Sequence, residues 1–426
     1  MAFTRREFIA GAVAGSTLAL VGCGTQPVQK KSLAQVVVIG AGYAGATAAK
    51  YIRILAPDVN VTVIEPAELF ISCPLSNLVV SGNKSLAEIS ASYGALRSKY
   101  GIQFIRDSVV AIDATKQEVR LAQGGNAVRY DRLIVAPGVQ FMYDTIPGLR
   151  DASAQELVLH GWKAGQQTVA LRKQLETMRD GGVYAIHIPK APYRCPPGPY
   201  ERACLVANYF KQAKPKSKVL ILDSNEDVVS KKPLFLKIWK ELYPDLIEYR
   251  PSSELVDVDA NSRTAKLTFD EVKADVLNVL PPMKAGKIAE TAGLITANNR
   301  WCEVDFLTYE SKVAKNIHVL GDAILAAPAM PKSGHMANGH GKACAAAVVA
   351  LLKNLPVNPS PMLTNTCYSF ITDKEVIHVA SVHRYDDAKK TMVTVDGSGG
   401  LSNAATEIEG QYAMAWAKNI WADILA

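Results

Sequence analysis

The sequence predicts an α/β protein built from parallel sheets with helices on both faces, for three reasons. A short apolar run at residues 35–39 leads through a glycine-rich turn into a helical stretch and a second apolar strand. A second strand–helix–strand succession covers residues 183–223, and a later buried strand near residue 317 ends in Gly-Asp. Strands that alternate with helices in this way indicate parallel βαβ units. The 426 residues are enough for two or three such domains.

Composition and charge exclude several classes of protein. Hydrophobic residues make up 49% and charged residues 20%, which is typical of a folded globular protein and not of a disordered chain. The net charge of +7 is small for this length, and part of it lies in the first residues (Arg5, Arg6, Lys30 and Lys31). We therefore predict no nucleic-acid-binding surface. No group of Cys and His residues has the spacing of a zinc site, so we predict no metal.

The first residues have the pattern of an export signal. Residues 4–8 (TRREF) form a twin-arginine motif, and the apolar run 9–22 is shorter than the about 20 residues that cross a bilayer. Twin-arginine export carries folded, cofactor-loaded proteins, so we expect a periplasmic location and a redox cofactor. A buried N-terminal helix is the alternative interpretation. Cys23 ends a lipobox-like sequence, and both a lipid anchor and a coincidental cysteine stay open.

The first glycine-rich turn predicts a dinucleotide site. Residues 40–45 (GAGYAG) form a G-x-G-x-x-G directly after the first strand. Gly40 permits the tight turn, Gly42 lets the backbone approach a pyrophosphate, and Gly45 lets helix and strand pack closely. The helix N-terminus then faces the anion, and Glu65, about 20 residues further on, can accept hydrogen bonds from ribose hydroxyls. Strand, glycines, helix and acid in register make chance an unlikely explanation.

Two later segments decide which dinucleotide binds. Residues 130–138 form a strand that ends in a small-Pro-Gly turn, and residues 316–323 form a strand that ends in Gly-Asp. These segments resemble the remaining fingerprints of FAD-dependent flavoproteins related to the disulfide reductases. The resemblance implies that Asp322 binds the ribityl chain and that a helix beginning near Ser333 directs its positive end at the flavin pyrimidine. The FAD-binding residues predicted from these segments are Ala136, Gly138, Gly321, Asp322, Ser333 and Gly334.

A second nucleotide site is missing its glycines. The framework is present, with strands at 183–188 and 218–223 and a helix at about 201–212. Residues 189–200 (PKAPYRCPPGPY) occupy the place of the glycine turn and contain Cys195. Prolines remove backbone donors and stiffen the loop, so it cannot surround a pyrophosphate in the usual way. We therefore expect that NADH and NADPH are not the reductants.

Three cysteine motifs make the resemblance specific. They are ISCPLSN around Cys73, the proline-rich loop around Cys195, and NTCYS around Cys367. From about Gln35 to the C-terminus the chain resembles the flavoprotein subunit of flavocytochrome c sulfide dehydrogenase, a relative of sulfide:quinone oxidoreductase. The resemblance implies that Cys73 holds FAD through an 8α-thioether bond. It also implies that Cys195 and Cys367 form a redox-active disulfide beside the flavin.

Several roles stay open within this resemblance. An ordinary structural disulfide or two free thiols are the alternatives for Cys195 and Cys367. Glu201 matches a family carboxylate near the disulfide, and it is explained equally well as a proton acceptor for H₂S and as a partner of the helix dipole. The remaining cysteines match no motif, and we interpret them as packing residues: Cys204, Cys302 and Cys344.

The implied function is an exported sulfide dehydrogenase. Hydrosulfide would attack the disulfide, electrons would pass through FAD to a c-type cytochrome on a partner, and sulfur or polysulfide would be released. The partner must carry the haem because this chain has no C-x-x-C-H motif. The alternatives are a sulfide:quinone oxidoreductase and a non-enzymatic flavin electron-relay protein. For the quinone enzyme, residues 415–425 would be a membrane-surface helix, but we favour a helix packed on its own domain.

The resemblance also implies the domain organisation: two Rossmann-like three-layer domains and a C-terminal α+β region. We expect a leader and linker at residues 1–32 and an FAD domain in two segments, 33–148 and 285–355. The inserted NAD-like domain, without a nucleotide fingerprint, is expected at 149–284. The C-terminal region, 356–426, would supply Cys367 and the surface that faces the cytochrome.

Overall fold

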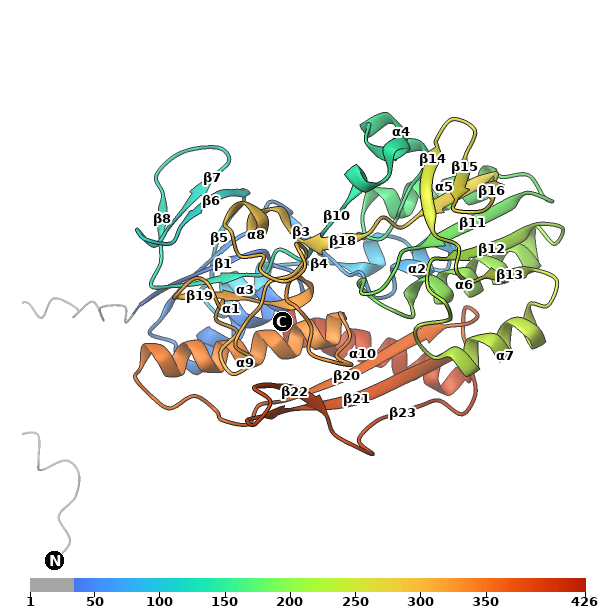
Figure 1. Ribbon diagram of the computed structural model, residues 1–426. Coiled ribbons are helices and arrows are strands. Elements are labelled where there is room, and N and C mark those ends of the chain that lie inside the picture. Colours follow the sequence, from blue (N-terminus) through green and yellow to red (C-terminus); the bar gives the residue numbers. More distant parts are fainter. Residues whose placement is uncertain (1–33) are drawn as a thin grey trace, which may run out of the picture. The chain divides into compact units, whose positions relative to one another are not determined.

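The structure is a computed structural model that describes residues 34–426 (Figure 1). The twin-arginine motif and Cys23 lie outside the described residues, so the export signal and the lipid anchor remain predictions. None of the helices in residues 34–426 is both long and apolar enough to span a membrane.

A five-stranded parallel sheet forms the first structural core, in the order β19-β9-β1-β2-β5. Its central strand β1 is completely buried at Val36, Val37 and Val38, as expected for a parallel strand covered on both faces. Strand β19 comes from late in the chain and pairs in parallel with β9, so two distant segments complete this sheet. The strands are β1 (Gln35–Ile39), β2 (Asn60–Ile64), β5 (Gln103–Ile105), β9 (Arg132–Val135) and β19 (Ile317–Val319).

Helices α1 (Tyr43–Leu55) and α9 (Gly334–Leu352) pack against each other beside this sheet. A Cβ atom on Gly341 would lie 2.6 Å from the Ala44 carbonyl oxygen, so glycine allows the two helices to approach closely. Smaller elements complete the region: β3 (Leu69–Ile71), α2 (Ser76–Val80), β4 (Ser90–Ser92), α3 (Gly94–Ser98), the meander β6 (Val109–Asp113), β7 (Glu118–Leu121) and β8 (Val128–Arg129), and α8 (Lys287–Thr291).

A second parallel sheet, in the order β13-β12-β11-β17, has the same strand–helix–strand plan. Strands β10 (Val139–Phe141) and β18 (Met283–Ala285) pair antiparallel on either side of it in the chain. Its elements are α4 (Ala152–Leu157), α5 (Gln166–Thr177), β11 (Val183–Ile188), α6 (Gly198–Ala213), β12 (Lys218–Asp223), α7 (Lys232–Leu242), β13 (Ile247–Arg250), the antiparallel β14 (Leu255–Asp259), β15 (Thr264–Leu267) and β16 (Glu271–Lys273), and β17 (Val276–Val279).

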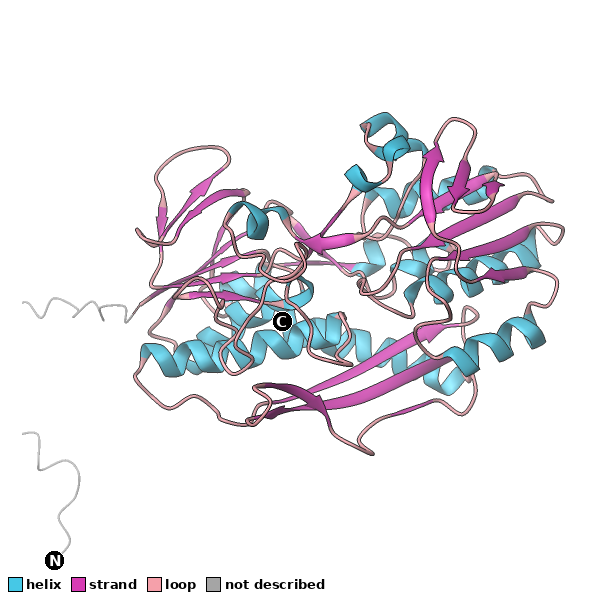
Figure 2. Cartoon of the chain, in the orientation of Figure 1, coloured by secondary structure: helices cyan, strands magenta, loops and turns pink. Residues whose placement is uncertain are grey.

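The C-terminal region is an antiparallel sheet, β20-β21-β22 with β23 paired to β21, and a final helix. Figure 2 shows the long strands β20 and β21 near helices α9 and α10, and contacts join β20 to α9 and α10. Ile420 and Ile424 of α10 are buried, and the Lys50 ammonium of α1 donates to the carbonyl oxygen of Ala426 at 2.6 Å. The helix is therefore packed on its own protein, as we favoured from the sequence. The elements are β20 (Met362–Phe370), β21 (Val376–Asp386), β22 (Thr391–Thr394), β23 (Gly400–Leu401) and α10 (Glu407–Leu425).

The fold class predicted from the sequence is confirmed. Two parallel sheets with flanking helices and a C-terminal α+β region are present. The domain boundaries stay a prediction, because the described residues, 34–426, belong to one compact unit.

Candidate functional site

The first glycine turn has the geometry of a dinucleotide cradle. A Cβ atom on Gly40 would lie 2.5 Å from the Ala136 carbonyl oxygen, and one on Gly45 would lie 1.9 Å from the Gly40 carbonyl oxygen. A Cβ atom on Gly42 would meet nothing within 4 Å. Two glycines therefore allow backbone to pack on backbone, and the third borders open space. This arrangement fits the roles proposed for a pyrophosphate-binding turn.

The acid that ends β2 lies beside this turn. The Glu65 carboxylate accepts hydrogen bonds from the backbone N–H groups of Ala41 and Ala67, both at 2.8 Å. These bonds hold the carboxylate next to the first turn of α1. The third predicted strand, β9, reaches the same place, where Gly138 has a φ of +64° that suits glycine.

The late Gly-Asp segment supplies a carboxylate without a partner. Atom Oδ1 of Asp322 is buried and has no hydrogen-bond partner among the described residues. Burial raises the pKa of this carboxyl group, and the nearby Arg194 and Lys332 charges oppose that shift. A buried acceptor of this kind needs a donor, and a ribityl hydroxyl of FAD would supply one. The residues present therefore fit FAD.

The helix that follows begins as the sequence predicts. Ser333 is the N-cap of α9, and its hydroxyl accepts from the Met336 N–H at 3.0 Å and donates to Asn365 Oδ1 at 2.6 Å. A Cβ atom on Gly334 would lie 3.2 Å from the ring of Tyr43 and from Pro74. The N-terminus of α9 is thus held between the first nucleotide turn and strand β20, with its positive end directed toward both.

Cys73 lies half-buried directly before Pro74, in a network that reaches the last helix. The neighbouring Ser72 hydroxyl lies 2.7 Å from the Tyr43 hydroxyl, and the indole N–H of Trp421 donates to both oxygens, at 3.2 and 3.0 Å. These contacts fix the backbone on which Cys73 stands. Covalent attachment of FAD through Cys73 remains a prediction.

Arg194 connects the residues predicted for FAD with the second cysteine loop. Burial lowers the pKa of its guanidinium, but the nearby Cys73, Asp322 and Cys195 raise it more. Groups from three segments that were predicted separately therefore surround one positive charge.

The proline-rich loop presents Cys195 in a strained conformation. Its φ is +59°, its N–H donates to the Lys332 carbonyl oxygen at 2.9 Å, and the Gly198 N–H donates to its carbonyl oxygen at 2.9 Å. A Cβ atom on Gly198 would lie 2.8 Å from the Cys195 sulfur and 2.7 Å from the Trp162 ring. Glycine at the start of α6 therefore lets the sulfur pack closely against the helix. Such backbone strain is typical of functional sites.

The second nucleotide position is filled by side chains. The Tyr200 and Tyr249 hydroxyls donate to Oδ2 of Asp223 at 2.7 and 3.1 Å, and the Asn225 amide donates to Oδ1 at 2.7 Å. Asp223 ends β12, where a dinucleotide-binding domain places the acid that binds ribose. Its oxygens already have hydrogen-bond partners, and Tyr193 and Tyr200 are both buried. This packing supports the expectation that NAD(P)H does not bind here.

Cys367 lies on strand β20, on the face that it shares with Asn365 and Ser369. The Asn365 amide lies 3.4 Å from its sulfur, and the Thr366 N–H donates to His335 Nδ1 at 3.0 Å. Burial raises the pKa of the Cys367 thiol, and the nearby Lys231 charge lowers it. Burial also raises the pKa of the Cys195 thiol, and the nearness of Cys367 raises it further. The two cysteines therefore act on each other electrostatically, but both are free cysteines in the structure, so their disulfide stays a prediction.

Glu201 completes the cluster from the first turn of α6. Its carboxylate accepts from the Phe370 N–H at 3.1 Å and from the Asn77 amide at 3.0 Å. Burial raises its pKa, and these hydrogen bonds and the Lys231 charge oppose the shift. Glu201 thus joins the second loop, strand β20 and helix α2 beside both thiols. This position agrees with the proton-acceptor role but leaves the helix-dipole role open.

Sequence reasoning missed three residues of this cluster. Asn77 belongs to the ISCPLSN motif around Cys73, and Arg194 belongs to the proline-rich loop around Cys195. The sequence pattern predicted no role for either residue. Lys231 is the first of two adjacent lysines and belongs to no recognisable motif. The predicted packing cysteines are fully buried, as expected: Cys204, Cys302 and Cys344. The described residues contain no cluster of side chains suited to a metal ion.

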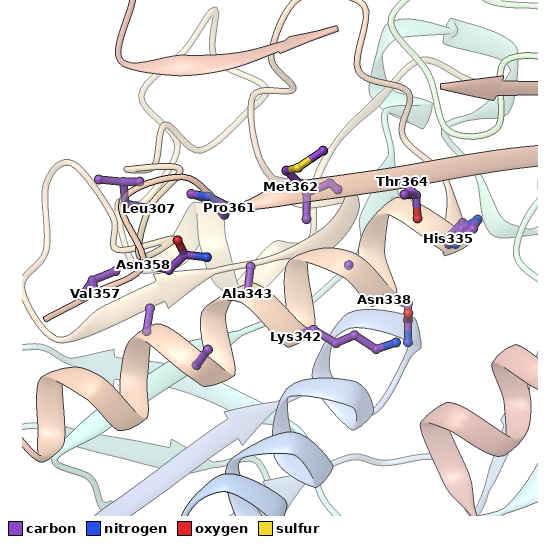
Figure 3. Close-up of a pocket in the computed structure, with 14 residues that line it drawn as sticks. Leu307, His335, Asn338, Lys342, Ala343, Val357, Asn358, Pro361, Met362 and Thr364 are labelled. Carbon is purple, nitrogen blue, oxygen red and sulfur yellow. The ribbon is translucent and has the colours of Figure 1, made fainter. Parts of the chain in front are cut away.

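A separate cavity of about 340 Å³ lies between α9 and the start of β20. Figure 3 shows His335, Asn338 and Lys342 on its helical side and Met362 on the strand side. The Lys342 ammonium already pairs with Asp423 at 2.9 Å, and the Asn338 amide donates to the same carboxylate. No cysteine of the predicted disulfide lines this cavity, so it is not the site of the cysteine chemistry.

Comparisons with known proteins match three parts of the chain to family models. Residues 34–183 match the pyridine nucleotide-disulphide oxidoreductases. Residues 168–281 match the central part of the sulfide dehydrogenase (flavocytochrome c) flavoprotein chain, and residues 359–425 match the flavin-binding part of flavocytochrome c sulphide dehydrogenase.

Individual relatives agree with these matches. The flavoprotein chain of sulfide dehydrogenase from Chlorobaculum thiosulfatiphilum is 51% identical over 45 residues, which are 11% of this chain and 94% of that sequence. The mitochondrial sulfide:quinone oxidoreductase of Mus musculus is 24% identical over 305 residues. That match covers 68% of this chain and 65% of the mouse protein, which is less than two thirds of its length.

The fold is similar to solved structures as well. The crystal structure of the sulfide:quinone oxidoreductase from Aquifex aeolicus superposes with a TM-score of 0.73 at 18% identity, over 92% of this chain and 91% of that one. Putidaredoxin reductase, in its covalent complex with putidaredoxin, superposes with a TM-score of 0.66 at 15% identity, over 91% of this chain and 93% of that one. The family matches and the FAD-type cradle together show that the chain belongs to the flavoprotein family of flavocytochrome c sulfide dehydrogenase, an FAD-binding oxidoreductase family related to sulfide:quinone oxidoreductase.

Proposed function

We propose that this protein oxidises hydrogen sulfide through a Cys195–Cys367 disulfide and passes the electrons through FAD to a c-type cytochrome. The observation that carries the proposal is the meeting of Cys195, Cys367 and Glu201 in one buried electrostatic cluster. These residues come from a loop, a strand and a helix that are far apart in the sequence. Arg194 links the same cluster to Asp322, the carboxylate that we predict to bind FAD.

The chemistry follows from thiol–disulfide exchange. Hydrosulfide would attack one sulfur of the pair, forming a persulfide on that cysteine and leaving the electron pair of the broken bond on the other sulfur as a thiolate. Glu201, held by the Phe370 N–H and Asn77, would accept the proton of H₂S. Bound FAD would supply two-electron acceptance and single-electron release. Further sulfide would release sulfur or polysulfide from the cysteine.

The partner and the compartment belong to the same proposal. A c-type cytochrome would receive the electrons, and its haem would lie on a partner, since this chain has no haem-attachment motif. The twin-arginine motif supports a periplasmic location for the proposed reaction, with or without a lipid anchor at Cys23. FAD would be covalently held by Cys73.

Sulfide-driven reduction of the flavin tests the disulfide role. In a Cys195→Ser or Cys367→Ser protein, stopped-flow reduction of the flavin by sulfide should slow at least about 100-fold while FAD remains bound and absorbs normally. The matched control is Cys344→Ser, which replaces a fully buried sulfur of helix α9 that is not among the groups acting on Cys195, Cys367 or Glu201. A Cys195→Ser rate near that of the parent protein would show that the disulfide is structural.

A sulfide:quinone oxidoreductase is the second candidate, favoured by the match to the mouse enzyme over 68% of this chain. Helix α10 packs on α1 with apolar residues in the core, which argues against α10 being a membrane-surface anchor. Turnover with cytochrome c and with a short-chain quinone, measured side by side, separates the two candidates. Faster sulfide oxidation with the quinone would replace the cytochrome proposal.

A further inference from the structure

Lys231 is a buried ammonium beside the cysteine cluster. The residue stands directly before helix α7 and is 4% exposed. Its Nζ donates to the Ser369 hydroxyl at 2.7 Å and to the Ile377 carbonyl oxygen at 3.3 Å. These partners are neutral, so neither compensates the positive charge.

A buried ammonium without a compensating charge is costly, and burial accordingly lowers the pKa of Lys231 to about 8. The groups whose negative charge opposes this shift are, in order, Cys367, Glu201, Cys195 and Glu409. Cys367 comes first. A thiolate on Cys367 would therefore compensate the charge of the ammonium.

The backbone holds Lys231 in this place. Its φ of +56° is uncommon for a residue with a side chain, and its carbonyl oxygen accepts from the Leu234 and Phe235 N–H groups at the start of α7. Ser369 stands two residues after Cys367 on β20, so both side chains point to the same face of the strand. The bond to Ser369 consequently directs the ammonium along the face that carries the cysteine sulfur.

The charged and polar groups that act on Cys367 come from several elements, and one of them is Cys195 of the proline-rich loop. Glu201 of α6 raises the pKa of the thiol, as does burial. Lys231, Asn365 of the same strand and Ser333 at the start of α9 lower it. Lys231 is the cation among these groups.

We propose that Lys231, held in place by Ser369, stabilises a thiolate on Cys367 when the cysteine pair is reduced. The inference deepens the proposed function and rests on it for its catalytic meaning. In the exchange step, hydrosulfide forms a sulfur–sulfur bond with Cys195 while the Cys195–Cys367 bond breaks. The electron pair of the broken bond stays on the Cys367 sulfur, where Lys231 provides the opposite charge. Lys231 is thus a positioning residue that makes Cys367 the leaving group.

The test measures the ionisation of Cys367 directly, without sulfide. The FAD-loaded protein is reduced with a phosphine, alkylated with iodoacetamide across a pH series, and analysed by peptide mass spectrometry to obtain the apparent pKa at each cysteine. Lys231→Met should raise the apparent pKa of Cys367 by about one pH unit or more, since an opposite charge within a few ångströms has an effect of this size. Lys231→Arg should restore most of the shift, and Ser369→Ala should produce a smaller one.

Lys214→Met is the matched control. Lys214 is also buried, and its ammonium also donates to neutral carbonyl oxygens, those of Glu176 and Met178, but it lies outside the cysteine cluster. The Lys214→Met substitution should leave the pKa of Cys367 unchanged. If Lys231→Met does not retain FAD, Lys231→Gln takes its place, because glutamine is neutral but can still bond to Ser369.

An unchanged Cys367 pKa in a folded, FAD-loaded Lys231→Met or Lys231→Gln protein would overturn the inference. Failure of the proposed function has a different signature. In that case the parent protein would not be reduced by sulfide, while the Lys231-dependent shift of the Cys367 pKa would still be measured.

Discussion

The two parallel-sheet regions of this protein share one plan and differ in the loop after the first strand. In the first region, β1 leads into a turn where Gly42 borders open space. The Glu65 carboxylate accepts a hydrogen bond from the Ala41 N–H of this turn. In the second region, β11 leads into a proline-rich loop, and the Tyr200 hydroxyl donates a hydrogen bond to the carboxylate of Asp223. The same strand–helix–strand framework therefore carries a nucleotide cradle in one place and a rigid support for a cysteine in the other. The comparison teaches that the function resides in the loops and not in the fold.

The strongest way to break this comparison is to add a methyl group in the first turn. Gly45→Ala would place a Cβ atom 1.9 Å from the Gly40 carbonyl oxygen, a backbone atom that cannot give way without opening the turn. We expect loss of most bound FAD, measured as flavin absorbance per protein. The matched change in the second region, Gly198→Ala, meets the Cys195 sulfur and the Trp162 ring instead, and should keep FAD. A Gly45→Ala protein with full flavin content would contradict the cradle.

Cys73 sharpens the role of the first region. Acid denaturation of the parent protein should leave the flavin on the polypeptide, because a thioether bond survives unfolding. Cys73→Ala should still bind FAD through the nucleotide contacts, but should release it on denaturation and show a changed flavin potential. Free release of flavin from the denatured parent protein would show that the attachment is absent.

Asp223, the acid at the end of β12 in the second region, should have a smaller, pH-dependent effect on the free energy of unfolding. Burial raises the pKa of Asp223 above its ordinary value of 3.8, against the hydrogen bonds from Tyr200 and Asn225. The folded state then holds this proton more tightly than the unfolded state, so Asp223 lowers stability as the pH rises through that window. The free energy of unfolding of Asp223→Asn, relative to the parent protein, should rise between about pH 4 and the raised pKa. Urea unfolding at several pH values measures it, and a constant difference would count against a raised pKa.

The last prediction is that nicotinamide cofactors have no effect on the oxidation state of the flavin. Anaerobic NADH or NADPH should leave the flavin oxidised, because the second region has tyrosines where a dinucleotide would lie. Sulfide added afterwards to the same sample serves as the positive control. Bleaching of the flavin by NADH within seconds would refute the interpretation of the second region.

The sequence alone determined the local features of both regions. Strands β1, β11 and β12 agree with the predicted ranges residue for residue, and α9 begins at Gly334 with Ser333 as its N-cap, near the predicted start. These features follow from apolar periodicity, glycine turns and capping residues, which act over a few neighbouring positions. The cofactor and the cysteine motifs were also predicted from the sequence, but through resemblance rather than through spacing.

Only the tertiary structure decided which side chains surround the cysteines. The bond between Lys231 and Ser369 spans 138 positions in the sequence, and the bond from the Phe370 N–H to Glu201 spans 169. No local pattern marks such pairs, because a lysine before a helix or a serine on a strand is usually exposed. Such residues acquire a function only when packing removes them from water. Burial makes the pKa of each ionisable side chain depend on the groups that face it. That dependence, invisible in the linear chain, is what joins Lys231 to Cys367.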